Sequence, residues 1–309
     1  MYQGKRIGII IPYYRHAKHI GRVVRQIPAF IDRVIIVDDH SPEPLPPIHR
    51  KNVQILRHSK NQGVGGATVS GFKQILQTHP HIVVKMDADD QMDLDDLPAF
   101  LDPLILGRAE LSKGNRFYDF NSLKTMPLNR RLGNFFLSFL TKAATGYWKN
   151  FDPTNGFLAI KAEYLDKINL DALHPRFYFE TSLQAEAYFH RIRIMDIPIK
   201  SRYHAKSSNL RIGRELLRYP VRLTRTFLKR ILRKYFLYDF CMASIYILLG
   251  IPLLGFGLVF GLGTWVKNAG RGVLTPTGTI MLITLSIILG FQFLLEAIHM
   301  DIDQAPSPE

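Results

Sequence analysis

Short apolar runs alternate with helical patterns over the first 115 residues of the chain. Between the first two runs, Ile20, Val23, Val24 and Ile27 have helical spacing, and residues 67–77 follow a glycine-rich loop as a second helix. Continuous apolar strands separated by helices are typical of a parallel sheet that is covered on both faces. The expected strands are Ile7–Pro12, Val34–Asp38, Val53–Arg57 and Ile82–Met86. The pattern therefore predicts an α/β domain.

The C-terminal part of the chain has a different pattern, with two long runs that contain no charged side chain. Phe240–Val266 has 27 residues and Gly272–Leu295 has 24, whereas about 20 helical residues cross a bilayer. We expect a tight turn at Lys267–Arg271 and a transmembrane hairpin over residues 240–300, followed by a tail at 301–309. A buried helical hairpin in a soluble core is the alternative, but charge-free runs of this length are rare there.

The net charge of +14 is concentrated just before the first apolar run. From Arg202 to Lys234 there are eleven basic residues and one acidic residue, Glu215, which excludes a uniformly basic nucleic-acid binder. Residues 205–239 are expected to form two amphipathic helices divided at Pro220, suited to anionic headgroups; a solvated charged face is the alternative. The basic positions with helical spacing are Arg211, Arg214, Arg218, Arg222, Arg225, Lys229 and Arg233.

The same charge distribution predicts the orientation in the membrane. The basic stretch directly precedes the first apolar run, and the expected turn carries only Lys267 and Arg271. The positive-inside rule then places residues 1–239 and the C-terminal tail on the cytoplasmic side of the inner cell membrane. The first apolar run is short and meets Pro12, which is typical of a strand and not of a signal peptide.

Polar and glycine residues follow each of the four expected strands. Ligands of parallel sheets bind at the carboxyl ends of the strands, so these residues are expected at one site. The glycine-rich loop matches neither a Walker loop nor the full GxGxxG pattern, so the sequence supports neither an ATPase nor a dehydrogenase. The alternative to a ligand-binding role for the glycines is a simple tight turn. The segments are Pro12-Tyr13-Tyr14, Asp38-Asp39-His40-Ser41, Asn61–Gly66 and Asp87–Gln91.

The acidic run after the fourth strand predicts a metal site. Asp87, Asp89 and Gln91 alternate, so in an extended chain their side chains point the same way and offer oxygen atoms to a hard divalent cation. The single cysteine, Cys241, excludes a cysteine-rich zinc site. A solvated loop or a helix N-cap is the alternative, and the following acids, Asp93, Asp95 and Asp96, are expected to be helix-start charges.

In this order, these residues resemble the family-2 glycosyltransferases with a GT-A fold, in which the sheet is Rossmann-like and mostly parallel. The likeness covers residues 5–300, and the C-terminal hairpin narrows it to the polyprenyl- and dolichol-phosphate hexosyltransferase branch. The QxxRW motif of processive synthases is absent. The resemblance implies a GT-A domain over residues 1–204. The matching pieces are IIIPYY, VDDHS, NQGVGGA, MDADDQ, GNRF, DPTNGFLAI and FYFE.

The resemblance also implies roles for individual residues. Asp87, Asp89 and Gln91 would hold Mg²⁺ or Mn²⁺ against the donor's diphosphate, and Asp89 would be catalytic. The donor pocket would include Pro12, Tyr13, Asp39 and Gly66. Arg116, Arg131 and Arg202 would meet phosphates, since a guanidinium presents a planar fork to phosphate oxygens. Arg130 is an equal candidate beside Arg131, and Arg202 could instead begin the basic helix face.

The implied reaction is inverting transfer of a hexose from a nucleotide-diphosphate sugar to a polyprenyl phosphate. Asp152 or Glu180 would be the general base if one is needed, and either could instead be a structural hydrogen-bond acceptor. No nucleic acid is expected as partner; the expected partners are membrane lipids, a second copy of the chain, and a flippase or transferase that uses the lipid-linked sugar. The alternatives are another lipid acceptor, such as diacylglycerol or a lipid-linked oligosaccharide, and a non-catalytic membrane-anchored binding module.

Two segments depart from the family pattern. The loop after the second strand usually has the sequence DDGS and a short acidic turn, whereas here it is DDHSPEPLPP. The acceptor segment usually has the pattern RxxGxSK, and here Arg202–Ser208 lacks the glycine. Base specificity and recognition of the lipid phosphate are therefore open.

Overall fold

The computed structural model describes residues 1–118, 128–152, 155–199 and 212–308, without the side chains of residues 128–132, 134 and 212–217. The chain divides into two compact units, one of Met1–Phe227 together with Pro306–Glu309 and the other of Leu228–Ala305. The first unit contains the sheet, and the second contains two long apolar helices.

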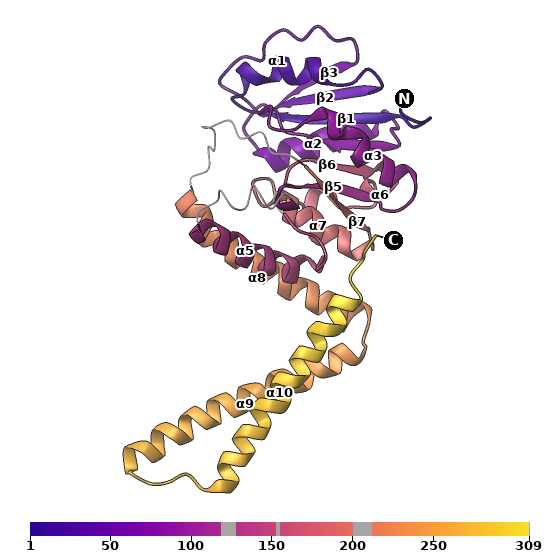
Figure 1. The fold of residues 1–309 in the computed structure, drawn as a ribbon. Coiled ribbons are helices and arrows are strands. Elements are labelled where there is room, and N and C mark those ends of the chain that lie inside the picture. Colours follow the sequence, from indigo (N-terminus) through magenta and orange to yellow (C-terminus); the bar gives the residue numbers. More distant parts are fainter. Residues whose placement is uncertain (119–127, 153–154, 200–211, 309) are drawn as a thin grey trace. The chain divides into compact units, whose positions relative to one another are not determined.

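Seven strands of the first unit form one sheet in the order β3-β2-β1-β4-β6-β5-β7 among the described residues (Figure 1). β6 runs antiparallel to its neighbours β4 and β5, while the other pairs are parallel. The four predicted strands are confirmed to within one residue at each end. The strands are β1 (Ile7–Tyr13), β2 (Arg33–Asp38), β3 (Val53–Arg57), β4 (Ile82–Lys85), β5 (Leu111–Asn115), β6 (Leu158–Lys161) and β7 (Ile194–Pro198).

Helices cover both faces of this sheet, as the continuous apolar strands predict. On one face, Ile9 and Ile11 of β1 pack in a core with helices α1 and α3. On the other face, Ile10 packs in a second core with α2 and α7. Side chains alternate between the two faces along a strand, so both faces can be buried. The helices of this unit are α1 (Ala17–Gln26), α2 (Val64–Leu76), α3 (Leu97–Ile105), α5 (Leu128–Thr145), α6 (Ala162–Leu165), α7 (Phe179–Phe189) and most of α8 (Ile212–Leu232), whose last residues, from Leu228, belong to the second unit.

The acidic residues that follow the metal motif start a helix, as expected. Asp93 accepts a hydrogen bond from the backbone N–H of Asp95 and so caps the short helix η1 (Leu94–Asp96), which leads directly into α3. Side-chain caps of this kind satisfy the free N–H groups of a first turn. These acids therefore serve the helix start.

The predicted division of the basic segment at Pro220 is wrong, because α8 continues through it. Packing on both sides of the proline holds the helix together. Before it, the Tyr219 hydroxyl lies 2.8 Å from Thr181 Oγ1, and after it Leu223 is buried against Tyr178. These contacts with α7 outweigh the helix-breaking tendency of proline.

The second unit contains two antiparallel helices, α9 (Met242–Arg271) and α10 (Thr277–Asp303), which pack against each other (Figure 1). Each is long and apolar enough to cross a membrane. The predicted turn at Lys267–Arg271 is wrong, since α9 continues to Arg271 and the connection is residues 272–276. Gly272 ends the helix with φ of 62°, a conformation that glycine adopts at little cost.

The C-terminal residues also differ from the expected tail, because α10 extends to Asp303. Asp301 is buried in this unit, where it forms a bidentate ion pair with Arg230, with both distances 2.8 Å. Lys234 Nζ and the Tyr235 hydroxyl also contact its carboxylate, at 3.0 and 2.8 Å. The short π-helix η4 (Arg233–Tyr238) carries these two residues. Buried partners for an acidic group explain why the helix continues past the apolar run.

Candidate functional site

The acidic run lies directly after β4, at the carboxyl edge of the sheet. Asp87 and Asp89 are partly exposed, whereas Asp90 is buried and pairs with Arg22 of α1 at 3.0 Å. Burial, together with the negative charge of Asp87, raises the pKa of the Asp89 carboxyl. Asp89 Oδ1 accepts a hydrogen bond of 3.2 Å from the backbone N–H of Gln91.

This donor set fits a hard divalent cation. Two neighbouring carboxylates, of which Asp87 disfavours the charged form of Asp89, with an amide side chain in the same turn, are ligands that Mg²⁺ and Mn²⁺ accept. Over the described part of the chain, no three His, Cys, Asp or Glu side chains form a complete metal cage. The remaining ligands would therefore have to come from the amide of Gln91, from water or from substrate.

A buried lysine, which the sequence analysis missed, lies beside this run. Lys85 is the last residue of β4, and its ammonium lies 2.9 Å from Asp87 Oδ1 and 3.0 Å from Glu180 Oε1 in the first turn of α7. Burial lowers the pKa of Lys85, but Asp87 and Glu180 outweigh this effect and raise it. A lysine inside the apolar run IVVKM was the signal that could have revealed it.

The loop before β6 approaches the same two side chains. A Cβ atom added to Gly156 would lie 2.4 Å from Asp87 Oδ2 and 2.5 Å from Lys85 Nζ, distances that no side chain can occupy without displacing them. In this loop, the backbone at Gly156 therefore packs directly against the metal motif, and a larger residue fits only if the ends of the Asp87 and Lys85 side chains move.

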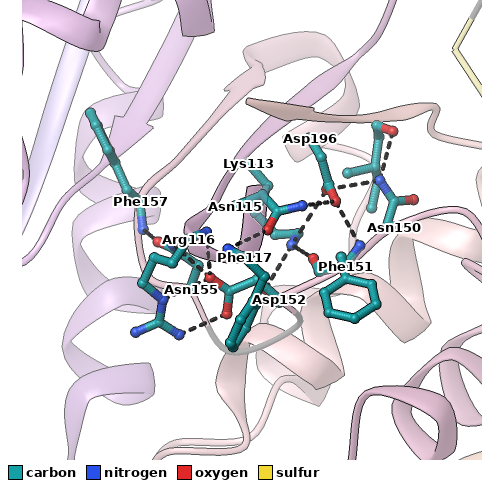
Figure 2. A network of polar contacts seen from close by, with 11 residues as sticks. Lys113, Asn115, Arg116, Phe117, Asn150, Phe151, Asp152, Asn155, Phe157 and Asp196 are labelled. Atoms are coloured by element: carbon teal, nitrogen blue, oxygen red, sulfur yellow. Dashed lines mark hydrogen bonds and ion pairs between the residues drawn. The ribbon is translucent and has the colours of Figure 1, made fainter. Parts of the chain in front are cut away.

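The same segment holds Arg116, which follows β5 (Figure 2). The Arg116 guanidinium donates two hydrogen bonds of 2.7 Å to the carboxylate of Asp152. Burial would raise the pKa of Asp152, but the hydrogen bonds and charge of Arg116 hold it below its ordinary value. Asp152 has φ of 51°, an uncommon conformation for a residue other than glycine. The ion pair thus fixes both the loop backbone and the arginine.

A second buried cation secures this loop from β5. Lys113 Nζ donates to the backbone oxygens of Phe151 and Asp152, at 2.6 and 2.7 Å, and lies 3.5 Å from Asp196 on β7 (Figure 2). Asp196 accepts from the backbone N–H of Phe151 and from the side chain of Asn150. A fully bonded buried network of this kind makes a loop rigid.

Asp39 is buried under the glycine-rich loop, which it holds in place. Its carboxylate oxygens accept hydrogen bonds of 2.7 Å from the backbone N–H groups of Gln62 and Gly63. One oxygen also lies 2.8 Å from His58 Nδ1, whose other nitrogen contacts Ser70. Asp39 therefore orders the loop from within, which the nucleoside-pocket prediction did not anticipate.

Gly66, which was expected in the donor pocket, contacts the chain before α7. Its backbone N–H donates to the carbonyl oxygen of Pro175 at 2.9 Å. Added Cβ atoms at Gly63 and Gly65 would likewise collide with the backbone of Pro175 and His174. These glycines allow the loop to pack closely against the chain before α7, and the backbone N–H of Gly66 has a partner within the protein.

Of the other predicted site residues, Pro12 and Tyr13 lie at the end of β1, whereas the two remaining arginines lie wholly or partly outside the described residues. Pro12 and Tyr13 are buried at the carboxyl end of β1, and the Tyr13 carbonyl accepts from the N–H of Asp39 at 3.0 Å. Burial raises the pKa of the Tyr13 hydroxyl. Arg131 lies on α5, but its side chain is outside the described residues, as is the whole of Arg202.

The comparisons with known proteins agree with this arrangement. The chain is 32% identical to the UDP-N-acetylglucosamine–dolichyl-phosphate N-acetylglucosaminyltransferase of Methanococcus voltae, over 68% of this chain and 92% of that protein. It is 27% identical to the polyprenol monophosphomannose synthase of Mycolicibacterium smegmatis, over 63% of this chain and 77% of that protein.

A solved structure supports the fold. Glucosyl-3-phosphoglycerate synthase from Mycobacterium tuberculosis, in complex with Mn²⁺, UDP and glucosyl-3-phosphoglycerate, superposes with a TM-score of 0.51 at 18% identity, over 74% of this chain and 80% of that chain. The GT-A fold expected from the motifs is thereby confirmed. The model of glycosyl transferase family 2 matches residues 8–168, just over half of the chain, and the protein therefore belongs to this family.

Proposed function

We propose that the protein is a membrane-bound, inverting hexosyltransferase that uses a UDP- or GDP-linked sugar and a polyprenyl phosphate at the cytoplasmic face of the membrane. The main observation behind this proposal is a combination found in one chain. The chain has the Asp87–Asp89 pair, an Arg116 held by Asp152, and two helices long and apolar enough to cross a membrane. Relatives named for dolichyl- and polyprenol-phosphate acceptors support the choice of acceptor.

On the donor side, Asp87, Asp89 and Gln91 would hold Mg²⁺ or Mn²⁺. When bound, the cation offsets negative charge on the leaving diphosphate. Pro12 and Tyr13 would line the nucleoside pocket, with the loop behind them ordered by Asp39.

On the acceptor side, Arg116 would bring the lipid phosphate to the sugar. Because a phosphate monoester has a second pKa of about 6, it is mostly dianionic at neutral pH and needs little deprotonation. This favours positioning roles for Asp152, which holds Arg116, and for Glu180, which holds Lys85, over the role of a strong general base. Arg131 and Arg202 stay candidates for further phosphate contacts.

The membrane anchor has a direct role in this proposal. Moving a polyprenyl chain into water costs about 0.8 kcal/mol per CH₂ group, so the catalytic unit has to work at the bilayer surface. Exposed aromatic side chains on α5 suit such a surface: Phe135, Phe136 and Phe139 are 46%, 66% and 57% exposed. We assign residues 1–204 to catalysis, 205–239 to headgroup contact and 240–300 to the bilayer, with 301–309 cytoplasmic.

The proposal is tested with purified full-length protein in detergent, Mn²⁺ and undecaprenyl phosphate. Radiolabelled UDP- and GDP-hexoses, including UDP-N-acetylglucosamine, are assayed for transfer of label into the organic phase. We expect transfer from one donor and its loss in Asp89→Ala. The matched control is Asp95→Ala, an exposed acid in the same run, which should keep wild-type transfer.

The other outcomes discriminate between the alternatives. Nucleotide release without labelled lipid would retain the donor site and reject the polyprenyl acceptor, which favours diacylglycerol or a lipid-linked oligosaccharide. Metal-dependent nucleotide binding without turnover of any donor would instead favour the binding module. Equal transfer by Asp89→Ala and wild type would reject the assigned metal site.

A further inference from the structure

Lys85 is an unusual residue for its position. It lies in a strand with buried neighbours on both sides of the sheet, and its side chain is 1% exposed. A buried ammonium is costly to desolvate, and ion pairing often does no more than offset that cost. An apolar residue would stabilise the strand equally well. The stability of the strand therefore does not explain why a charged residue is buried at position 85.

The contacts of Lys85 connect it with the proposed metal site. Its ammonium lies between Asp87 Oδ1 and Glu180 Oε1, at 2.9 and 3.0 Å. The other oxygen of Asp87, Oδ2, lies beside Gly156. The carboxylate of Asp87 is therefore already paired with a cation of the protein on one side and closely packed on the other.

The charges of the cluster balance in a specific way. With the three carboxyl groups ionised, Asp87, Asp89 and Glu180 contribute three negative charges and Lys85 one positive charge, which gives the cluster a charge of −2. One divalent cation would neutralise it, but that cation has to share Asp87 with Lys85. The diphosphate of a donor adds negative charge beside the cation and so shifts this competition towards metal binding.

We propose that Lys85 competes with the divalent cation for the carboxylate of Asp87, so that the metal binds weakly alone and tightly only together with the nucleotide diphosphate. This inference rests on the proposed function. Lys85 is then a positioning residue that couples metal and nucleotide binding, and the coupling is reciprocal. The metal would leave with the product nucleotide after each turnover.

The test measures Mn²⁺ binding to full-length protein in detergent, with and without UDP or GDP. The electron paramagnetic resonance signal of free Mn²⁺ reports how much of the ion is unbound. In Lys85→Met/Glu180→Gln, one charge of each sign is removed, and of the remaining groups only the partly exposed carboxylate of Asp87 loses an ion-pair partner. We expect Mn²⁺ without nucleotide to bind about tenfold more tightly than to wild type, and the tightening caused by nucleotide to shrink. Lys73→Met/Asp171→Asn removes an exposed ion pair and should change neither value.

A second variant keeps the test decisive if the double variant does not fold. In Glu180→Gln, Lys85 has only Asp87 as partner, so Mn²⁺ binding without nucleotide should weaken. Mn²⁺ affinities within about twofold of wild type in these folded variants would overturn the role of Lys85. If the wild-type protein binds no Mn²⁺ even with UDP or GDP, the metal-dependent function itself fails, together with the inference.

Discussion

The close approach of Gly156 to the metal motif gives a sharp prediction for Gly156→Ala. The new Cβ atom would lie 2.4 Å from Asp87 Oδ2, whereas ordinary contacts begin at 3.4 Å. The difference means that the carboxylate or the loop has to move by about 1 Å, a misplacement that can cost about 100-fold in rate when it affects a reacting group. We therefore expect transfer to fall by about 100-fold.

The fold should tolerate this substitution, because the atoms in the way, Asp87 Oδ2 and Lys85 Nζ, are the ends of flexible side chains. The assay is transfer of labelled sugar at saturating Mn²⁺, with thermal unfolding measured in parallel. The matched control is Gly21→Ala in α1, where the nearest atom to an added Cβ is 4.0 Å away; it should keep full activity. A folded Gly156→Ala protein with transfer within about threefold of wild type would refute the reasoning, since a 1 Å displacement should cost far more.

Three further predictions concern other buried ion pairs and networks. Asp301→Ala should destabilise the second unit by about 3–5 kcal/mol, because it removes the carboxylate that forms a buried ion pair with Arg230; an unchanged melting temperature in detergent would contradict this. Burial would raise the pKa of the Glu110 carboxyl, but hydrogen bonds from Arg193 outweigh burial and lower this pKa from its ordinary value of 4.5. The Glu110–Arg193 pair therefore stabilises the fold above pH 4.5, and this stabilisation is lost as the pH falls through the lowered pKa of Glu110. Melting temperatures of wild type should drop more steeply below pH about 4.5 than those of Glu110→Gln, and parallel curves would be evidence against the pair. Asp39→Asn should weaken UDP or GDP binding measured by calorimetry, since a neutral amide cannot accept from both loop N–H groups and His58 as the carboxylate does, and unchanged nucleotide affinity would reject an ordering role.

The positions where the sequence prediction failed have a common physical cause. Pro220 was expected to break a helix, yet the contacts of Tyr219 with Thr181 and of Leu223 with Tyr178 keep it intact. Asp301 was assigned to a tail, yet it pairs with Arg230. In each case the partner is distant in sequence, and local pattern carries no information about it.

The sequence by itself determined the alternation of strands and helices, the edge of the sheet where Asp87 and Asp89 lie, and the two apolar helices. These features depend on hydrophobic periodicity and on the length of charge-free runs, which are local properties. Only the tertiary structure decided that Lys85 pairs with Asp87 and Glu180, that Asp152 holds Arg116, and that Gly156 leaves room for Asp87. Buried charges need partners wherever the fold supplies them, and packing of distant segments, not spacing along the chain, brings those partners together.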